Sequence, residues 1–256
     1  MSESTARPFE ISIVIPAYNE EAVIEATVAA LIPALDDSGF RYELRIVDDG
    51  STDATWEKLQ ALHEVFPNIR PIKNKGPGGY GMAVKAGLNS FQGDAVIVAM
   101  ADGSDSPGDI VAYARALAEG YDCAFGMRFS GQGQVQGYPP VKRLLNRIGN
   151  RLIGRLTGSS YTDFTNGFKG YRRPVIEAMQ PLIAADFNLT VEMSIKAVMS
   201  GASFKVLPNG WTDRAGGESK FNVWRLGTRY LFTIAYCLLQ NHLKNAGARP
   251  RAPLSH

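Results

Sequence analysis

The chain has 256 residues, of which 45% are hydrophobic and 20% are charged, and its formal net charge is +2. A chain of this length and composition can form one large domain with a full hydrophobic core. A net charge so close to neutral excludes any argument for nucleic-acid binding from charge alone.

Short runs rich in β-branched residues alternate with helix-like segments through the first half. This alternation predicts an α/β protein with a mostly parallel sheet that helices cover on both faces. The first helix is expected to end near Pro33, because proline interrupts helices. The predicted strands are 11–18, 42–49, 68–73, 94–101 and 121–126, and the predicted helices are 20–35, 52–65, 82–91 and 107–120.

Two segments of the second half, 141–156 and 221–244, have the spacing of amphipathic helices. Two interpretations stay open for each: a helix packed on the core with a solvated polar face, or a helix lying on an anionic membrane surface. In the first segment the apolar positions are Val141, Leu144, Leu145, Ile148, Leu152 and Leu156, and a basic ridge consists of Arg143, Arg147, Arg151 and Arg155.

Polar side chains follow the predicted strands at their carboxyl ends, where parallel sheets bind ligands. Asp48 and Asp49 end the second strand, and a carboxylate there can accept a hydrogen bond from a nucleobase or a ribose hydroxyl. Asp53 is expected to cap the helix that follows.

A glycine-rich segment follows the third strand. Gly76, Gly78 and Gly81 have the spacing of a dinucleotide-binding loop. However, the preceding strand contains Pro71 and Lys73 instead of an apolar pattern, and two strand–helix units come first, which disfavours that interpretation. A turn whose amides approach a phosphate does not require a dinucleotide.

The fourth strand runs into Asp102. Asp105 and Ser106 are expected to form a turn and to cap the helix that begins at Pro107. Asp102 has no such explanation and is a candidate site residue. Glu192, in the predicted helix 187–199, is expected on a solvated face unless that face lines the cleft.

The three histidines, His63, His242 and His256, have no metal-binding spacing, so an imidazole base is not expected. The chemistry should then depend on carboxylates, a metal ion or an acceptor that is already anionic. The segment 211–221 places four charged residues around two glycines, which is typical of a mobile lid over an anion or of a plain surface loop.

In this order, the segments resemble family 2 glycosyltransferases, specifically the dolichol-phosphate mannose synthase-like branch. The resemblance covers roughly residues 11–236. The motifs that carry it are IPAYNE (15–20), VDDGSTD (47–53), GPGGYGMAVKAG (76–87), FGMRF (125–129), TDFTNGFKGYRR (162–173), FNLTVEM (187–193) and DRAGGESKF (213–221).

The resemblance implies a GT-A fold, a nucleotide-binding sheet flanked by helices. It implies inverting transfer of a sugar from GDP-mannose or a UDP-hexose to a polyprenyl phosphate, with Mg²⁺ or Mn²⁺ at the donor diphosphate. The resemblance assigns donor binding to Pro16, Tyr18, Glu20, Asp48, Gly78 and Gly79, and metal binding to Asp102 and Ser104. It assigns the acceptor phosphate to Arg128, Lys142 and Arg143, and charge neutralisation during loop closure to Arg214 and Lys220. The implied catalytic residues are Asp102, Arg128, Arg214 and Lys220.

Two departures from the family pattern bear on the metal. Met100 occupies the place of the first acid in D-A-D, and Ser104 replaces a polar residue that helps to hold the ion. A catalytically weakened nucleotide-sugar-binding protein, or a transferase acting on another lipid or a soluble acceptor, is therefore kept as an alternative. A nucleotidyltransferase is a further alternative, but its usual glycine-rich loop with a following lysine is absent.

The expected organisation is one domain over residues 1–240, including both amphipathic helices, and a disordered tail over 245–256. The first ten residues show no signal peptide, and the apolar stretch 230–239 is too short to span a bilayer. Cys123 and Cys237 are expected to be buried and reduced. These features indicate a cytoplasmic protein that contacts the inner face of the membrane peripherally.

Overall fold

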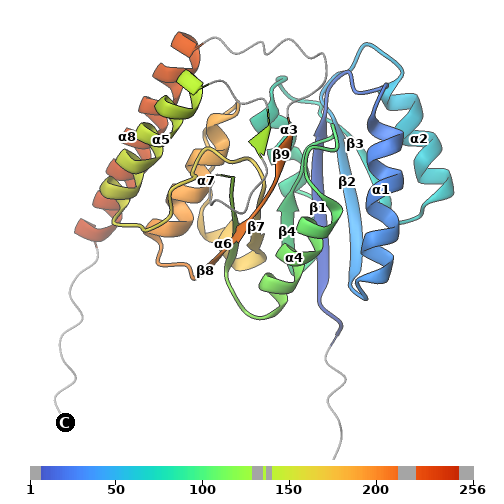
Figure 1. Cartoon of the computed structure of the whole chain (residues 1–256), viewed down its shortest axis with the longest axis horizontal. Coiled ribbons are helices and arrows are strands. Elements are labelled where there is room, and N and C mark those ends of the chain that lie inside the picture. Colours follow the sequence, from blue (N-terminus) through green and yellow to red (C-terminus); the bar gives the residue numbers. More distant parts are fainter. Residues whose placement is uncertain (1–6, 129–134, 137–139, 213–222, 248–256) are drawn as a thin grey trace, which may run out of the picture.

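The computed structural model describes residues 7–128, 135–136, 140–212 and 223–247. Its main feature is a seven-stranded sheet in the order β3-β2-β1-β4-β7-β5-β8, with helices on both faces (Figure 1). The strands are β1 (Glu10–Ala17), β2 (Arg41–Asp48), β3 (Ile69–Lys73), β4 (Ala95–Val98), β5 (Cys123–Met127), β7 (Lys169–Arg172) and β8 (Phe204–Pro208), and a separate pair is formed by β6 (Val135–Gln136) and β9 (Trp211–Thr212).

The predicted α/β class is confirmed, and strands β1 to β4 pair in parallel. The order reverses at β1, because β2 and β3 lie on one side of it and β4 on the other. Such a reversal leaves a crevice at the carboxyl ends of the central strands. The register places Ala17 beside Asp48, so the polar residues that follow both strands meet at this crevice.

Each face of the sheet buries its own core. On one face Ile13 packs in a cluster with apolar residues of α1 (Ile24–Asp37), α2 (Thr55–Val65) and α4 (Pro107–Ala118). On the other face Val14 packs with α3 (Tyr80–Leu88), α6 (Arg173–Ala178) and α7 (Asn188–Met199). Neighbouring residues of β1 thus point to opposite faces, and both faces are apolar because both are covered.

Helix α1 does not end near Pro33, as the sequence predicted, but continues to Asp37 with the proline inside it. Leu31 and Leu35 are buried on either side of Pro33. Their burial favours the continued helix and offsets the hydrogen bond that the proline cannot donate.

Strand β7 is antiparallel to both of its neighbours, β4 and β5, and the alternation of strands and helices did not predict this orientation. It begins with Lys169, whose side chain is 1% exposed. The Nζ atom donates a hydrogen bond to the carbonyl of Phe164 at 2.9 Å and another to the carbonyl of Asn166. Burial lowers the pKa of Lys169 to about 7, although Asp163 favours the charged form.

Helices α5 (Pro140–Thr157) and α8 (Val223–Gly247) both pack against α7, at the end of the molecule away from α1 and α2 (Figure 1). Helix α8 runs three residues into the segment 245–256 that was predicted to be disordered. None of the helices within the described ranges has the length and apolar character needed to cross a bilayer.

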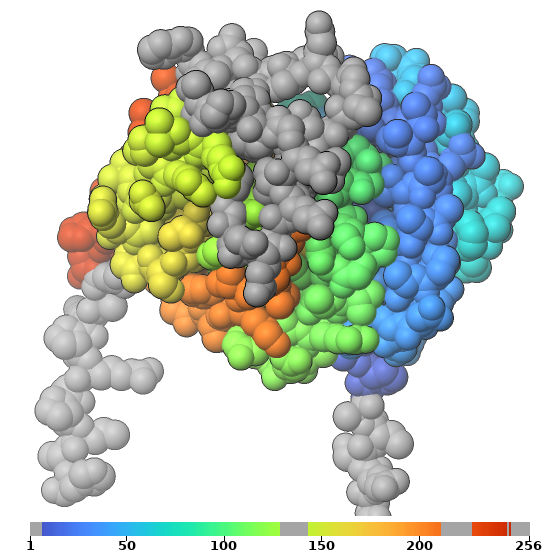
Figure 2. Space-filling view, viewed as in Figure 1, coloured from blue at the N-terminus to red at the C-terminus, as the bar shows by residue number. Residues whose placement is uncertain are grey.

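The predicted apolar face of α5 lies on the surface instead of in the core. Leu144, Leu145, Ile148, Leu152 and Leu156 are 49–60% exposed. The surface of this helix forms the yellow-green region in Figure 2. Its four arginines, Arg143, Arg147, Arg151 and Arg155, are exposed as well. The core-packed interpretation of this stripe is therefore wrong.

The start of α3 packs tightly on the segment before α7. A Cβ atom on Gly81 would lie 2.7 Å from the carbonyl carbon of Ala185 and 2.8 Å from the amide nitrogen of Asp186. Gly79 has a φ of +136°, and a Cβ there would lie 2.7 Å from the Ala185 oxygen. These glycines are required by close backbone contact as well as by conformation.

We predict that Gly81→Ala lowers the free energy of unfolding by about 1–3 kcal/mol, because the added methyl meets backbone atoms that cannot rotate away. Gly227→Ala is the matched control, since a Cβ at that exposed position of α8 meets nothing within 4 Å. Replacing that helical glycine should raise stability by up to about 1 kcal/mol. Urea denaturation measures both values, and an equal effect of the two variants would contradict the packing argument.

We also predict that Lys169→Met changes how stability depends on pH. Between about pH 7 and the ordinary lysine pKa of 10.5, the unfolded chain binds a proton on this amine that the folded protein does not, so wild-type stability gains from rising pH. The variant should lose this gain. Lys205→Met is the control, because a hydrogen bond with Glu119 raises the pKa of Lys205. Urea unfolding at about pH 7 and about pH 9.5 measures how much the free energy of unfolding changes with pH in wild type and in both variants. An equal change in wild type and Lys169→Met would refute the prediction.

Candidate active site

The loops after β1 and β2 are joined at the crevice by hydrogen bonds. The amide of Asn19 donates to Ser51 Oγ at 3.0 Å, and the amide of Thr52 donates to Asn19 Oδ1 at 2.8 Å. Asn19 has a φ of +54°, in the left-handed region that asparagine tolerates better than most residues. Glu20 follows it and donates its amide to Thr55 Oγ1 at 2.8 Å.

The predicted donor-binding residues Pro16, Tyr18, Glu20 and Asp48 lie at this joined edge. Pro16 is buried at the end of β1, and Tyr18 beyond it is 52% exposed. Asp48 is 3% exposed and accepts the amide of Ser51 at 3.2 Å. The arrangement combines a buried carboxylate with an exposed aromatic ring, which suits recognition of a planar base with a polar edge.

Asp49 holds the glycine-rich segment. Its Oδ2 accepts the amide of Gly79 at 2.7 Å, and its Oδ1 accepts the Nδ2 of Asn74 at 2.7 Å. The amide of Gly76 donates to Asn74 Oδ1. Two amides of the segment are therefore bound by side chains of the protein. Donor binding at Gly78 and Gly79 stays a prediction, and any phosphate contact would have to add to these bonds.

Asp102 and Ser104 lie in a turn just beyond β4. The amide of Ser104 donates to Asp102 Oδ1 at 3.1 Å, and Gly103 between them has a φ of +70°. Within the described ranges, no three His, Cys, Asp or Glu side chains form a group that could hold a metal ion. A carboxylate and a hydroxyl are nevertheless the hard oxygen donors that Mg²⁺ and Mn²⁺ prefer, and such ions commonly keep ligands from phosphate and water. Asp102 and Ser104 therefore fit a sparse divalent site.

Asp105 is not the cap that the sequence predicted. Its side chain is buried, and its Oδ2 accepts the amide of Met100 at 2.8 Å. Ser106 occupies the N-cap position of α4 and makes no side-chain cap bond. Burial raises the pKa of Asp105 to about 7, although the Met100 amide favours the charged form. The side chain of Asp105 lies inside the protein because the Met100 amide, at the end of the strand, needs a hydrogen-bond acceptor.

Arg128 follows β5 and forms a buried ion pair with Asp163. Its Nε donates to Asp163 Oδ2 at 3.1 Å and its Nη2 to Oδ1 at 2.7 Å, while its backbone amide also donates to Oδ2. Nη2 is in addition 3.0 Å from Thr165 Oγ1. The side chain of Arg128 is 10% exposed and that of Asp163 is 2% exposed. Arg128 is thus rigidly oriented, and a contact with an anion would add to these bonds.

The other predicted cations are placed only in part. Arg143 is exposed in the first turn of α5. Lys142 belongs to the same turn, but its side chain is outside the described part of the structure. Arg214 and Lys220 lie outside the described residues altogether. The structure therefore does not test the roles assigned to Lys142, Arg214 and Lys220.

Glu192 is a residue whose importance the sequence argument missed. It is 0% exposed, not on a solvated face. It accepts the amides of Ile183 and Ala184 at 2.7–3.1 Å and pairs with Lys196 at 2.7 Å. It thereby fixes the segment that packs on the start of α3. Its apolar neighbours in the helix were the signal, because a carboxylate among them must find internal partners.

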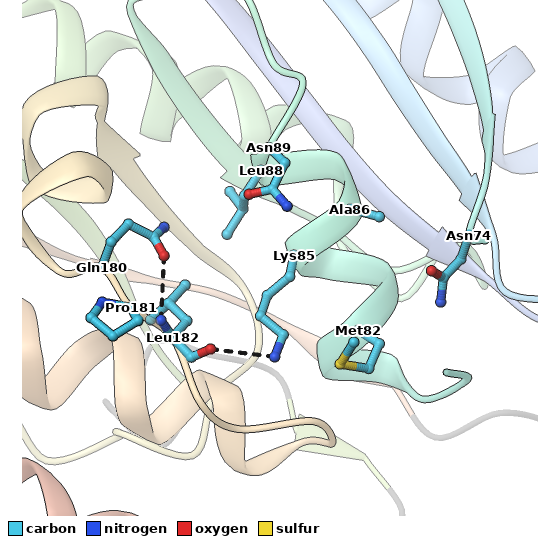
Figure 3. A pocket seen from close by; sticks show the side chains of 9 residues that line it. All are labelled: Asn74, Met82, Lys85, Ala86, Leu88, Asn89, Gln180, Pro181 and Leu182. Atoms are coloured by element: carbon cyan, nitrogen blue, oxygen red, sulfur yellow. Dashed lines mark hydrogen bonds between the residues drawn. The ribbon is translucent and has the colours of Figure 1, made fainter. Parts of the chain in front are cut away.

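A pocket of about 350 Å³ lies beside α3, away from the predicted site residues (Figure 3). Lys85 enters it and donates to the carbonyl of Leu182 at 3.4 Å. Burial lowers the pKa of Lys85. Because none of the predicted donor, metal or acceptor residues lines this pocket, the candidate active site is assigned to the strand ends.

Curated relatives are similar to most of the chain. Dolichol-phosphate mannosyltransferase of Pyrococcus furiosus is 32% identical over 214 residues, covering 82% of this chain and 59% of the relative. Undecaprenyl-phosphate 4-deoxy-4-formamido-L-arabinose transferase of Edwardsiella ictaluri is 30% identical over 246 residues, covering 91% and 69%. The chain thus spans about three fifths of the length of the archaeal relative.

A solved structure supports the fold. Glucosyl-3-phosphoglycerate synthase from Mycobacterium tuberculosis, in complex with Mn²⁺, UDP-glucose and phosphoglyceric acid, matches with a TM-score of 0.64 at 22% identity. The match covers 91% of this chain and 79% of that one. The predicted GT-A architecture is confirmed by this likeness.

The model of one protein family matches residues 12–179, which include β1 to β5, β7 and the acidic strand ends described above. The matched span contains Asp48, Asp102 and Arg128, and it covers more than half of the chain. Together with the relative from Edwardsiella ictaluri, this match shows that the chain belongs to glycosyl transferase family 2.

Proposed function

We propose that the protein is an inverting glycosyltransferase that moves a sugar from a nucleotide sugar, GDP-mannose or a UDP-hexose, to a polyprenyl phosphate at the cytoplasmic face of a membrane. The observation that carries this proposal is the outward-facing stripe of α5. Leu144, Ile148 and Leu152 are about half exposed there, beside exposed arginines. A soluble acceptor gives no reason to expose such a stripe, whereas an anionic lipid surface matches both its apolar and its basic part.

Helix α8 supports the same proposal from the same end of the molecule. Leu231, Phe232, Leu239 and Leu243 are 59–65% exposed. Its other side packs on α7 through residues such as Cys237 and Thr233, which are buried. Two helices with apolar outer sides at one end of the protein would place that end in the interface. The relatives that act on dolichol and undecaprenyl phosphates support a lipid acceptor.

The donor would bind at the crevice, with its nucleoside held by Pro16, Tyr18, Glu20 and Asp48. A phosphate oxygen of the acceptor would attack the anomeric carbon, and the bond from that carbon to the nucleoside diphosphate would break. A phosphate monoester is already ionised near neutral pH, so the reaction needs no histidine base. It needs positive charge at the departing diphosphate instead.

The residues assigned to that charge are Arg214 and Lys220, whereas Arg128, Lys142 and Arg143 would receive the acceptor phosphate. Asp102 and Ser104 would hold Mg²⁺ or Mn²⁺, which when bound supplies further positive charge to the diphosphate. The synthase from M. tuberculosis was solved with Mn²⁺ and UDP-glucose, so a protein of this fold binds a divalent ion together with a nucleotide sugar.

The direct experiment is a donor panel. Radiolabelled GDP-mannose and UDP-hexoses are incubated with the protein and with vesicles that contain undecaprenyl or dolichyl phosphate, and the lipid extract is counted. Label in the lipid from one donor supports the proposal. Nucleotide-sugar binding without transfer supports a binding protein, and transfer only to water-soluble phosphates supports a soluble acceptor.

We predict that Asp102→Asn weakens Mn²⁺ binding in the presence of nucleoside diphosphate by at least about tenfold, because the amide loses the charge that a hard cation requires. Wild type should bind Mn²⁺ much more weakly without the nucleotide, since few protein ligands are available. Electron paramagnetic resonance titration of free Mn²⁺ measures this, and the exposed Asp37→Asn on α1 is the control. Equal Mn²⁺ affinity in Asp102→Asn and wild type would remove Asp102 from the site.

We predict that Leu152→Glu lowers binding to anionic vesicles by at least about tenfold, since a Leu side chain loses burial and a like charge is added. Binding of nucleoside diphosphate should stay unchanged. Val65→Glu is the matched control, because Val65 is 66% exposed on α2 at the other end of the molecule. Vesicle sedimentation measures the binding, and salt should weaken it. Equal losses in both variants, or no wild-type binding at low salt, would contradict a membrane-facing α5.

A further inference from the structure

Helix α5 turns two asparagines inward, while its leucines and arginines are exposed. Asn150 is 1% exposed and Asn146 is half-buried, whereas the leucines of the same helix face outward. Burying two amides while exposing a leucine stripe costs free energy unless the amides are bonded and the stripe is covered. The two inward amides therefore need a hydrogen-bond partner inside the protein.

That partner is the hydroxyl of Thr165, in the turn before β7. The Nδ2 atoms of Asn146 and Asn150 lie 3.0 Å and 3.2 Å from Thr165 Oγ1. The amide nitrogen of Thr165 in turn donates to Asn150 Oδ1 at 3.3 Å. Asn150 also donates to Asn146 on its own helix. Two turns of α5 are thus bonded to one hydroxyl.

The same hydroxyl contacts Arg128. Its Nη2 donates to Thr165 Oγ1 at 3.0 Å and to Asp163 Oδ1 at 2.7 Å. Asp163 fixes the guanidinium along one edge, and Thr165 contacts it from the side of α5. A short, continuous series of contacts therefore connects the outer leucines of α5 to the guanidinium, through the helix, the two asparagine amides and the Thr165 hydroxyl.

We infer that Thr165, Asn146 and Asn150 are positioning residues that couple the seating of α5 on a lipid surface to the placement of Arg128. This inference rests on the proposed function, because it requires that α5 meets lipid and that Arg128 acts on the acceptor phosphate. When lipid covers the leucine stripe, α5 is held in one position, and the amides hold Thr165 and the guanidinium with it. Asp163 fixes one edge of the guanidinium without lipid, so the contact with Thr165 is the part of its placement that the seating of α5 changes.

The test uses the full chain and a short-chain isoprenyl phosphate that stays in solution as acceptor. Vesicles of anionic phospholipid without acceptor are added, and kcat and KM are measured with and without them. Wild type should show a higher kcat with vesicles. Thr165→Val should lose most of this stimulation, about tenfold, because a misplaced catalytic group loses rate steeply. Vesicle binding and nucleoside diphosphate binding should remain.

Thr157→Val is the matched control. Thr157 lies on the same helix, and its hydroxyl bonds only to the α5 carbonyls of Ile153 and Gly154 among the described residues. This variant should keep the wild-type stimulation. Asn146→Ala, at a half-buried position, gives a second and milder variant should Thr165→Val fold poorly. Equal stimulation in wild type, Thr165→Val and Asn146→Ala would overturn the inference and leave the proposed function standing.

A second readout does not depend on the acceptor. The ¹⁵N resonance of the Arg128 Nε–H group, assigned by its absence in Arg128→Lys, is recorded with and without anionic bicelles. It should shift in wild type and Thr157→Val but not in Thr165→Val. No shift in wild type overturns the coupling. If lipid phosphate is not glycosylated and the shift still occurs, the acceptor assignment falls and the coupling is retained.

Discussion

A charged pair buried between β5 and the turn before β7 organises the second half of the protein. Arg128 and Asp163 satisfy one another through three hydrogen bonds in a place where an unpaired charge would be costly. Two hydrogen bonds hold the turn that carries Asp163: Lys169 Nζ donates to the carbonyl of Phe164, and the amide of Thr165 donates to Asn150 of α5. The antiparallel strand β7 begins directly after this turn, so the pair fixes the sheet and the site together.

Much of the polar machinery around the site binds backbone instead of solvent. Asp49 accepts the Gly79 amide, Asp105 accepts the Met100 amide, and Glu192 accepts two amides before α7. Each carboxylate lies where a strand or loop ends and leaves an amide without a ladder partner. These bonds make the crevice rigid before a ligand arrives, which lowers the entropy cost of binding. Asp48 and Asp102 likewise accept the amides of Ser51 and Ser104, and they remain the candidates to meet the donor.

The end of the molecule formed by α5 and α8 differs from the rest in the side chains that it exposes. The faces of the central sheet bury apolar residues almost completely, as Ile13 and Val14 illustrate. On α5 the pattern is reversed, with leucines outside and asparagines inside. The Thr165 hydroxyl accounts for the inward asparagines, and through it they are connected to the Arg128 side chain.

The sequence by itself determined the parallel half of the sheet, because β-branched runs alternate with helical periods there, and it placed Asp48 and Asp102 at strand ends. It also identified α5 as amphipathic, but periodicity states only that two faces differ, and which face lies inside depends on the neighbour, here Thr165 and α7. Helix propensity likewise predicted that α1 ends near Pro33, whereas the helix continues to Asp37 because Leu35 is buried. The inward turn of Asp105 and the burial of Glu192 depended on amides brought near by distant segments. Tertiary structure alone decided these, because a polar side chain selects its partner only after the backbone is placed.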